Sequence, residues 1–202
     1  MRKANGIMRI NDNINKSHIH HNLLEKIFVK GINDAQIAGI DAILDEWIAS
    51  GLNDMRHLAY ILATAYHETD KTMQPIEEYG KGRGKKYGNK IKYDGTDYTY
   101  PNKIFYGRGH VQLTWYENYE KFGKLLHLPL LYYPEFMLDN NISARVLILG
   151  MTRGLFTGKK LSDYFNNKVS NPVQARRTVN GLDRADMIAN LYDRFLDCVI
   201  IQ

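Results

Sequence analysis

The chain has 202 residues, of which 44% are hydrophobic, and this length and composition suffice for one domain with a proper core. Only five prolines occur, and no Ser/Gly/Pro-rich or repeated stretch marks a linker, so we do not expect a separate binding module. The chain has one cysteine, Cys198, so a disulfide framework is excluded, and its apolar neighbours predict a buried thiol. The polar N-terminal residues lack the apolar core of a signal peptide, and no run is as long as a membrane span, so we expect synthesis in the cytoplasm.

The formal net charge is +5, and the excess is concentrated between Lys81 and Lys92, where six Lys or Arg residues occur without an acid. Such a segment favours an anionic partner, but nucleic acid, lipopolysaccharide, teichoic acid and peptidoglycan all meet that condition. A solvated loop without a ligand is an equally weighted alternative. The charge therefore indicates an anionic polymer as a class, and it does not identify which polymer.

A helical hairpin is predicted in the first half of the chain. Asn33 or Asp34 can cap a helix whose apolar residues recur at three- and four-residue spacing, and Gly51 ends it. Asn53 or Asp54 can cap a second helix directly afterwards. The buried stripe expected for this second helix comprises Leu58, Ile61, Leu62 and Ala65, and the helix ends near Glu68 and Thr69.

The segment from Met73 to Pro101 changes to Tyr, Gly, Lys and Asp without a helical period. Because it contains the turn signal Asp94-Gly95, we expect a loop with a small β-element here. Helical patterning returns from Trp115 to Leu126, from Ser143 to Leu155 and from Arg184 to Cys198. The predicted fold is therefore mostly α, a single domain over 1–202 with its core at about 33–198 and an N-terminal helical extension over 1–32.

Glu68 is the first candidate for chemistry. It stands at the C-terminal end of an apolar helix, where unpaired carbonyl groups present partial negative charge. An acid that protonates a glycosidic oxygen near neutral pH must hold its proton, and burial beside Tyr66 and the negative helix end both favour that. The simpler interpretation is a carboxylate in a salt bridge.

Glycoside hydrolysis usually requires a second carboxylate across a cleft. Glu77 and Glu78 are the nearest candidates, because they follow Pro75 in an irregular stretch that can fold back towards the helix. Asp94 and Asp97 are weaker candidates, since Asp beside Gly or Thr in such a stretch more often serves a turn.

A second motif occupies residues 105–115. Two glycines around an arginine at 107–109 allow a tight backbone path, for which a structural turn is the default interpretation. Gln112 and Thr114 then alternate with apolar neighbours in the manner of a strand. This spacing predicts that an amide and a hydroxyl point to the same side, towards a sugar or a bound water.

The order of these motifs resembles family 19 of the glycoside hydrolases, which holds chitinases and related endolysins of bacteriophages and prophages. The string Tyr-Gly-Arg-Gly-x-x-Gln-Leu-Thr-Trp lies at 106–115 with Asn-Tyr at 118–119 after it. His-Glu-Thr precedes it at 67–69, and Ala-Arg-Arg-Thr-Val-Asn-Gly follows at 175–181. The similarity runs over about 58–195, and it is specific because the motifs occur in the same order.

The resemblance implies a lysozyme-like α fold with two lobes around a sugar-binding cleft, and inverting hydrolysis without a cofactor or metal. The family's acid matches Glu68, and the Ser or Thr that helps to hold the attacking water matches Thr114. The family's cleft glutamine and asparagines match Gln112, Asn118 and Asn180.

One departure concerns the second carboxylate. In plant chitinases it lies much further past His-Glu-Thr, in a segment without a clear counterpart here. Glu77 stands nine residues after Glu68, a spacing similar to the acid-to-aspartate interval in phage lysozymes. We therefore predict Glu77 as the second carboxylate with Glu78 as the alternative, and we expect His67, Glu78 and Tyr106 among the substrate-binding residues.

Peptidoglycan is the predicted substrate, since the chain is small and has neither a recognisable secretion signal nor the disulfides usual in secreted chitinases. We expect a monomeric endolysin of muramidase type that acts on the cell wall after release and causes host lysis. Its expected partners are peptidoglycan glycan strands and, through 81–92, anionic envelope polymers. Hydrolysis of chitin oligomers is the alternative activity.

A non-catalytic protein that binds the cell wall or another anionic polymer is a third hypothesis, motivated by the 81–92 segment and fourteen tyrosines. No nucleic-acid-binding fold pattern accompanies them, so we expect no nucleic-acid partner. His18, His20 and His21 form a cluster far from the acidic motif, which favours a surface tract over a metal site. Cys198 has no histidine nearby in sequence, so thiol chemistry is not expected.

Overall fold

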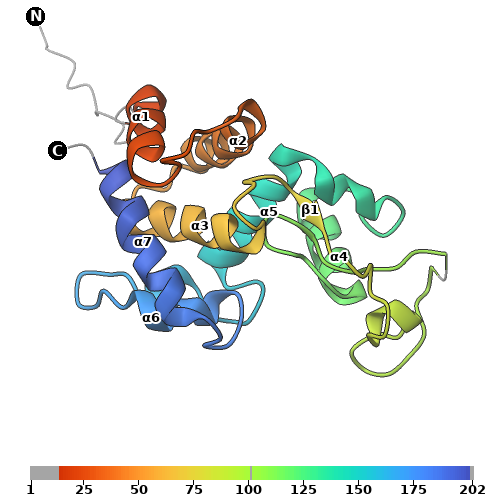
Figure 1. Cartoon of the computed structure of the whole chain (residues 1–202). Coiled ribbons are helices and arrows are strands. Elements are labelled where there is room, and N and C mark those ends of the chain that lie inside the picture. The colour runs from red at the N-terminus through yellow and green to blue at the C-terminus, as the bar shows by residue number, and fades with distance from the viewer. Residues whose placement is uncertain (1–13, 101, 201–202) are drawn as a thin grey trace, which may run out of the picture.

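The computed structural model describes residues 14–100 and 102–200. Its helices fall into two groups with α5 between them, and β1, α4 and the 81–100 loop lie on the side away from α1, α3 and α7 (Figure 1). The longer helices are α1 (Lys16–Lys26), α2 (Asp34–Ser50), α3 (Met55–Glu68), α4 (Tyr116–Leu126), α5 (Asn140–Arg153) and α7 (Ala185–Val199). The short elements are β1 (Ile76–Glu77), η2 (Tyr87–Asn89), β2 (Arg108–Gly109), η3 (Pro134–Leu138), η4 (Leu161–Asp163), α6 (Pro172–Ala175) and η5 (Arg176–Thr178). The prediction of a mostly α fold is confirmed.

Local capping explains why the predicted hairpin of α2 and α3 forms. Asn33 and Gln36 make a capping box, in which each side chain accepts a hydrogen bond from the other's backbone N–H, at 2.8 and 3.0 Å. Gly51 ends α2 in the left-handed region, at φ +71°. Asp54 caps α3 by accepting from the Arg56 N–H at 3.0 Å.

Burial of α3 extends beyond the predicted stripe, because every residue from His57 to Ala65 is buried. The helix packs against α7 on one side and against α2 and α5 on others, so no face of this stretch is left to solvent. A helix that is buried all round lies in the centre of a core. Glu68 is thus the last residue of the most enclosed helix in the described part of the chain.

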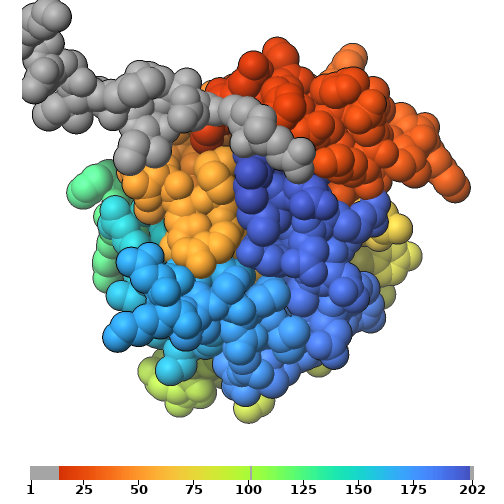
Figure 2. All heavy atoms as spheres, turned by 90° about the vertical axis from the view of Figure 1, so that its left-hand side faces the viewer, coloured from red at the N-terminus to blue at the C-terminus, as the bar shows by residue number. Residues whose placement is uncertain are grey.

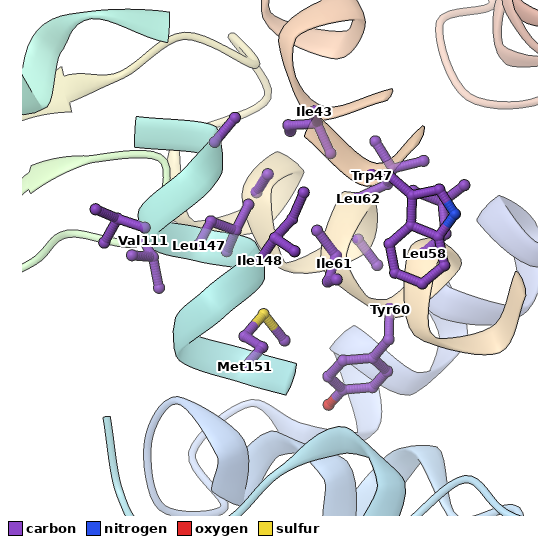
Figure 3. Packing of buried hydrophobic residues seen from close by; sticks show 14 of the residues in the cluster. Ile43, Trp47, Leu58, Tyr60, Ile61, Leu62, Val111, Leu147, Ile148 and Met151 are labelled. Carbon is purple, nitrogen blue, oxygen red and sulfur yellow. The ribbon is translucent and has the colours of Figure 1, made fainter. Parts of the chain in front are cut away.

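The hydrophobic core joins α2, α3 and α5, and side chains from all three helices meet in Figure 3. Trp47 of α2 and Tyr60 of α3 are among its largest fully buried side chains. Val111 reaches in from the turn after β2 beside Leu147 of α5 (Figure 3). The core therefore extends from the helical side of the molecule to the segment that carries Gln112 and Thr114.

Helix α1 lies within the predicted N-terminal extension and is fastened to α7. Ile19 and Leu23 are buried, and Asn22 donates from Nδ2 to the Cys198 carbonyl at 3.2 Å. Figure 2 shows α1, α3 and α7 side by side on one face. Residues 1–13 of that extension lie outside the described residues. Within the described ranges, no helix has the length and apolar character needed to cross a membrane.

The small sheet has two strands, β1 and β2, which pair antiparallel with Ile76 opposite Gly109 and Glu77 opposite Arg108. The chain then turns within residues 110–112 and returns, so that Leu113 N–H donates to the Arg108 carbonyl at 2.8 Å. The predicted strand-like alternation over 111–114 is wrong, because Gln112 adopts φ +53°, which a strand does not allow.

Residues 73–100 form a loop with little regular structure, as predicted. An isolated bridge joins Ile91 to Asp97, and the reversal between them lies at Gly95, whose φ is +86°. Asp94 Oδ1 accepts from the Thr96 N–H at 2.9 Å and from the Thr96 hydroxyl at 2.7 Å, so this aspartate serves the turn. Tyr98 anchors the loop, since its ring is buried against neighbouring aromatic rings.

His110 connects three parts of the fold and is fully buried. Its Nε2 lies 3.0 Å from the Met73 carbonyl, so Nε2 carries a hydrogen and donates it. Its Nδ1 therefore carries no hydrogen and accepts from the Ser143 hydroxyl at 2.9 Å, and the same Ser143 oxygen accepts from the His110 backbone N–H at 2.7 Å. Burial lowers the pKa of His110 to about 4, which keeps the ring neutral at ordinary pH.

We predict that His110 makes the fold less stable in acid. The unfolded chain takes up a proton near pH 6.5 whereas the folded chain does so near pH 4, so the contribution of His110 is complete above 6.5 and is lost as the pH falls towards 4. The loss amounts to about 3 kcal/mol. Urea unfolding at about pH 7 and about pH 4 should show it.

In that experiment His110→Gln, which has no titrating ring, should lose less stability between the two pH values than the natural chain. The exposed His21→Gln is the matched control and should behave like the natural chain. Equal losses in all three proteins would remove His110 as the cause.

Candidate functional site

A cavity of about 710 Å³ opens beside the end of α3. It is lined by Glu68, by the segment 111–115 after β2, by Asn118 of α4, and by two tyrosines of the 81–100 loop. Residues from 156–159 and 177–181 form the remaining wall. The cavity therefore collects segments that are distant in sequence.

Glu68 is held at the cavity by an ion pair. Arg176 Nη1 donates to Glu68 Oε1 at 2.7 Å, and Arg176 Nε donates to the Asp183 carbonyl at 3.2 Å. The Arg176 side chain is 3% exposed, whereas that of Glu68 is 17% exposed. Among the described residues nothing hydrogen-bonds Glu68 Oε2, so this oxygen is available to a ligand.

Sequence reasoning did not single out Arg176. It belongs to the 175–181 motif, in which the sequence predicts only Asn180 as a site residue. The available signal was an arginine within a motif already matched to the family. What sequence does not give is the pairing itself, because 108 positions separate Arg176 from Glu68.

Three polar side chains line the cavity close together. Gln112 Nε2 donates to the Ile76 carbonyl at 2.9 Å, and the Thr114 hydroxyl donates to the Gln112 carbonyl at 2.8 Å. Asn118 Nδ2 donates to the Thr114 carbonyl at 2.9 Å. These bonds fix the three side chains on one surface, as expected from the sequence, although by a tight turn instead of a strand.

The backbone around these residues is unusual. Gln112 and Trp115 have φ of +53° and +78°, conformations that cost side-chain-bearing residues free energy and persist where the surroundings impose them. Gly107 lies directly opposite, and a Cβ there would stand 2.8 Å from Gln112 Oε1 and 3.3 Å from the Thr114 hydroxyl oxygen. The glycine thus lets β2 approach the side chains that face the cavity.

Aromatic rings form another wall. Tyr93 stacks on Trp115 with ring centroids 4.1 Å apart and planes 20° apart, and Tyr87 meets the same indole edge-on at 5.2 Å. All three residues line the cavity. Flat apolar surface beside hydrogen-bonding groups is what a sugar ring requires, because one face of a pyranose is apolar and its rim is polar.

Glu77 does not line the cavity. Its carboxylate accepts from the Tyr106 hydroxyl and pairs with Lys81 at 2.9 Å, and Arg108 Nε lies 3.6 Å away. The Tyr106 hydrogen bond and the neighbouring cations lower the pKa of Glu77. Tyr106, also predicted in the site, points its hydroxyl to this side and does not line the cavity either.

Glu78 does not line the cavity itself, but it is bonded to a residue that does. The Tyr87 hydroxyl donates to its Oε1 at 3.0 Å, and the Gly107 N–H donates to its Oε2 at 3.1 Å. Tyr87 lines the cavity, and burial together with the bond to Glu78 raises the pKa of Tyr87 to about 12. One partner of Glu78, Tyr87, therefore lines the cavity, and the other, Gly107, lies against Gln112 and Thr114, which line it.

The cavity thus brings together five of the predicted site residues, namely Glu68, Gln112, Thr114, Asn118 and Asn180. It is not lined by His67, Glu77, Glu78 or Tyr106. His67 is half-buried next to Glu68, and burial lowers its pKa while the charge of Glu68 acts in the opposite direction.

No group of three His, Cys, Asp or Glu side chains within 14–100 and 102–200 is placed to hold a metal ion. The three N-terminal histidines each have a different neighbour: His18 faces Asn22 at 3.0 Å, His20 faces Asp41 at 3.0 Å, and His21 faces Glu25 at 3.3 Å.

Comparison with known proteins found no matching family model. Two curated relatives from Arabidopsis thaliana, Endochitinase At2g43610 and Endochitinase At2g43620, are each 39% identical to this chain, over 83 and 80 residues. Each alignment covers 40% of this chain and 26% of the relative, so the chain matches about a quarter of the length of these proteins.

Solved structures match over nearly the whole chain. Chitinase C from Streptomyces griseus HUT6037 superposes with a TM-score of 0.63 at 19% identity, over 98% of this chain and 79% of that one. A bacterial family 19 chitinase superposes with a TM-score of 0.59 at 17% identity, over 94% of this chain and 96% of that one. The chain therefore has the lysozyme-like helical fold of these chitinases.

We predict that the pair between Arg176 and Glu68 supports the fold as well as the site. Arg176→Gln removes the buried cation from a carboxylate that is largely enclosed, and should lower the free energy of unfolding by roughly 2–4 kcal/mol. Denaturant unfolding of Arg176→Gln, Glu68→Gln and the double variant measures the coupling.

In this double-mutant cycle, the double variant should be more stable than the sum of the two single losses predicts. The reason is that each single variant leaves one enclosed charge without its partner, whereas the double variant leaves none. Arg177→Gln, at the exposed neighbouring position, is the matched control and should change stability little. Strict additivity would contradict a direct interaction.

Proposed function

We propose that this protein is a glycoside hydrolase that cleaves the glycan strands of bacterial peptidoglycan. The observation that carries the proposal is a single cavity in which Glu68 meets a polar cluster and an aromatic wall. A glycosidase needs an acid beside the leaving-group oxygen, groups that hold water and sugar, and surface for the rings. The sequence match to two endochitinases supports the same type of chemistry.

In the proposed reaction Glu68 protonates the glycosidic oxygen as the bond to the anomeric carbon breaks. Arg176 occupies Oε1 of Glu68 and fixes the carboxyl group, which leaves Oε2 to give the proton. A water molecule adds to the anomeric carbon, and its proton passes to a second carboxylate. The Thr114 hydroxyl helps to hold this water, and the amides of Gln112, Asn118 and Asn180 bind the sugar substituents.

Glu78 is our choice for the second carboxylate, in place of the sequence-based preference for Glu77. Successive side chains of a strand point to opposite faces, and β1 sends Glu77 towards Lys81 and Tyr106. Glu78 instead bonds to Tyr87 and to Gly107, and Gly107 lies next to Thr114. Moreover, three partners stabilise the Glu77 carboxylate in its charged form, which makes it a weaker base.

We predict different outcomes for the three glutamates when reducing ends are counted after digestion of purified sacculi. Glu68→Gln and Glu78→Gln should each lower turnover by about 100-fold or more, because each removes a proton-transfer group. Glu77→Gln is the matched control at the adjacent position and should retain most of the activity.

Circular dichroism and thermal unfolding establish that each variant is folded. Loss of activity in Glu77→Gln with retention in Glu78→Gln would restore the sequence-based assignment. Natural turnover in a folded Glu68→Gln would remove the proposed acid altogether.

Chitin is the second candidate substrate, favoured by the names of the matched proteins. We predict faster release of reducing ends from murein sacculi than from chitin oligomers in parallel assays. Mass spectrometry of the soluble fragments then identifies the sugar at the new reducing end, and so separates muramidase from glucosaminidase action. Exclusive action on chitin would overturn the choice of peptidoglycan, and tight binding to sacculi without cleavage would favour a wall-binding protein.

A further inference from the structure

The wall formed by 156–159 and 177–181 carries charge that the proposed reaction does not use. Lys159 and Arg177 both line the cavity. Neither has an acidic partner among the residues the structure describes, and the recorded side-chain partner of Arg177 is the Gln174 amide, to which its Nε donates at 2.8 Å. Two cations are therefore presented to a ligand instead of being neutralised by the protein.

The backbone that carries Lys159 is held in place. Gly154 ends α5 at φ +70°, and the Gly158 N–H donates to the Gly154 carbonyl at 2.9 Å. Phe156 lies against Gly150 of α5, where a Cβ would stand 1.9 Å from its ring, and it also packs on Phe122 at 5.5 Å. The loop is thus anchored in the core on one side while Lys159 reaches the cavity on the other.

A hydrogen bond joins the two segments of this wall. The Thr157 hydroxyl donates to the Arg177 carbonyl at 2.5 Å, which ties the loop after α5 to the segment after α6. Arg177 directly follows Arg176, the partner of Glu68. The cationic wall is consequently continuous with the structure that positions the proposed acid.

The charge of the cavity is positive once existing pairs are counted. Glu68 is the acid that lines it, and because Arg176 pairs with Glu68, this carboxyl group adds no net negative charge whether it is ionised or holds a proton. Lys159 and Arg177 remain in excess. Chitin carries no carboxylate, whereas the muramic acid units of peptidoglycan bear a lactyl group and stem peptides that end in carboxylates.

We propose that Lys159 and Arg177 bind carboxylates on the muramic acid side of the glycan and so make the cavity prefer peptidoglycan over chitin. This inference rests on the proposed function and adds the residues that determine its specificity. Arg177 offers a planar fork suited to a carboxylate, and Lys159 offers a point charge on a flexible stem.

Binding measurements test the assignment apart from catalysis. Glu68→Gln is used as the background to prevent turnover, and the fluorescence of Trp115 in the cavity wall reports occupancy, since Trp47 is fully buried in the core. The ligands are a peptidoglycan tetrasaccharide with its stem peptides and chitotetraose, which carries no charge. The variant is Lys159→Gln/Arg177→Gln, and Lys160→Gln is the matched control, an exposed neighbour that does not line the cavity.

The double variant should bind the peptidoglycan ligand about tenfold more weakly and chitotetraose with nearly unchanged affinity. Added salt should weaken the first interaction and not the second. Lys160→Gln should bind both ligands as the background protein does.

Equal losses for the two ligands, no loss for either, or no binding of either ligand by the background protein would each overturn the assignment. Hydrolysis by the natural chain is measured separately. Preferential binding without any cleavage would refute the proposed hydrolase activity but support the role of Lys159 and Arg177 in binding. Cleavage without the binding preference would support the hydrolase activity and refute that role.

Discussion

The neutral ring of His110 fixes how the proposed site is assembled. One ring nitrogen holds the Met73 carbonyl and the other meets Ser143 of α5, so the turn after β2 is tied both to the segment that follows α3 and to a central helix. Gly39 of α2 presses on the same Met73 carbonyl, since a Cβ there would lie 1.7 Å from that oxygen. Thr114 and Glu68 consequently take fixed places relative to each other.

A second set of interactions, the ion pair of Arg176 and the hydrogen bond of Thr157, holds another wall of the cavity in place. Arg176 reaches Glu68 from the segment after α6, and Thr157 connects that segment to the loop after α5. The acid is therefore supported by its own helix and by the segment directly after α6, a helix that packs against α7. This support from two directions keeps a charged pair in an enclosed position, where breaking it costs more than the pair itself contributes.

Local signals made most of the fold predictable. The capping box at Asn33, the left-handed Gly51 and the cap at Asp54 act within a few residues, so they are legible in the sequence. The resemblance located Glu68, Gln112 and Thr114, which do line one cavity. The sequence does not distinguish the surroundings of Glu77 from those of Glu78, because these depend on which segments contact each side chain once the chain has folded. Arg176 was missed because its partner lies far away along the chain.

The packing of α3 against α7 also has a consequence for biosynthesis. The apolar surface of α3 is covered largely by α7, which leaves the ribosome much later, after the 81–100 loop, both strands and α4 to α6. A nascent chain must therefore carry that surface uncovered through most of its translation, when association with other chains competes with folding. Chaperones that shield α3 during this interval should favour the folded product, and Glu68 meets Arg176 only after most of the domain has been made.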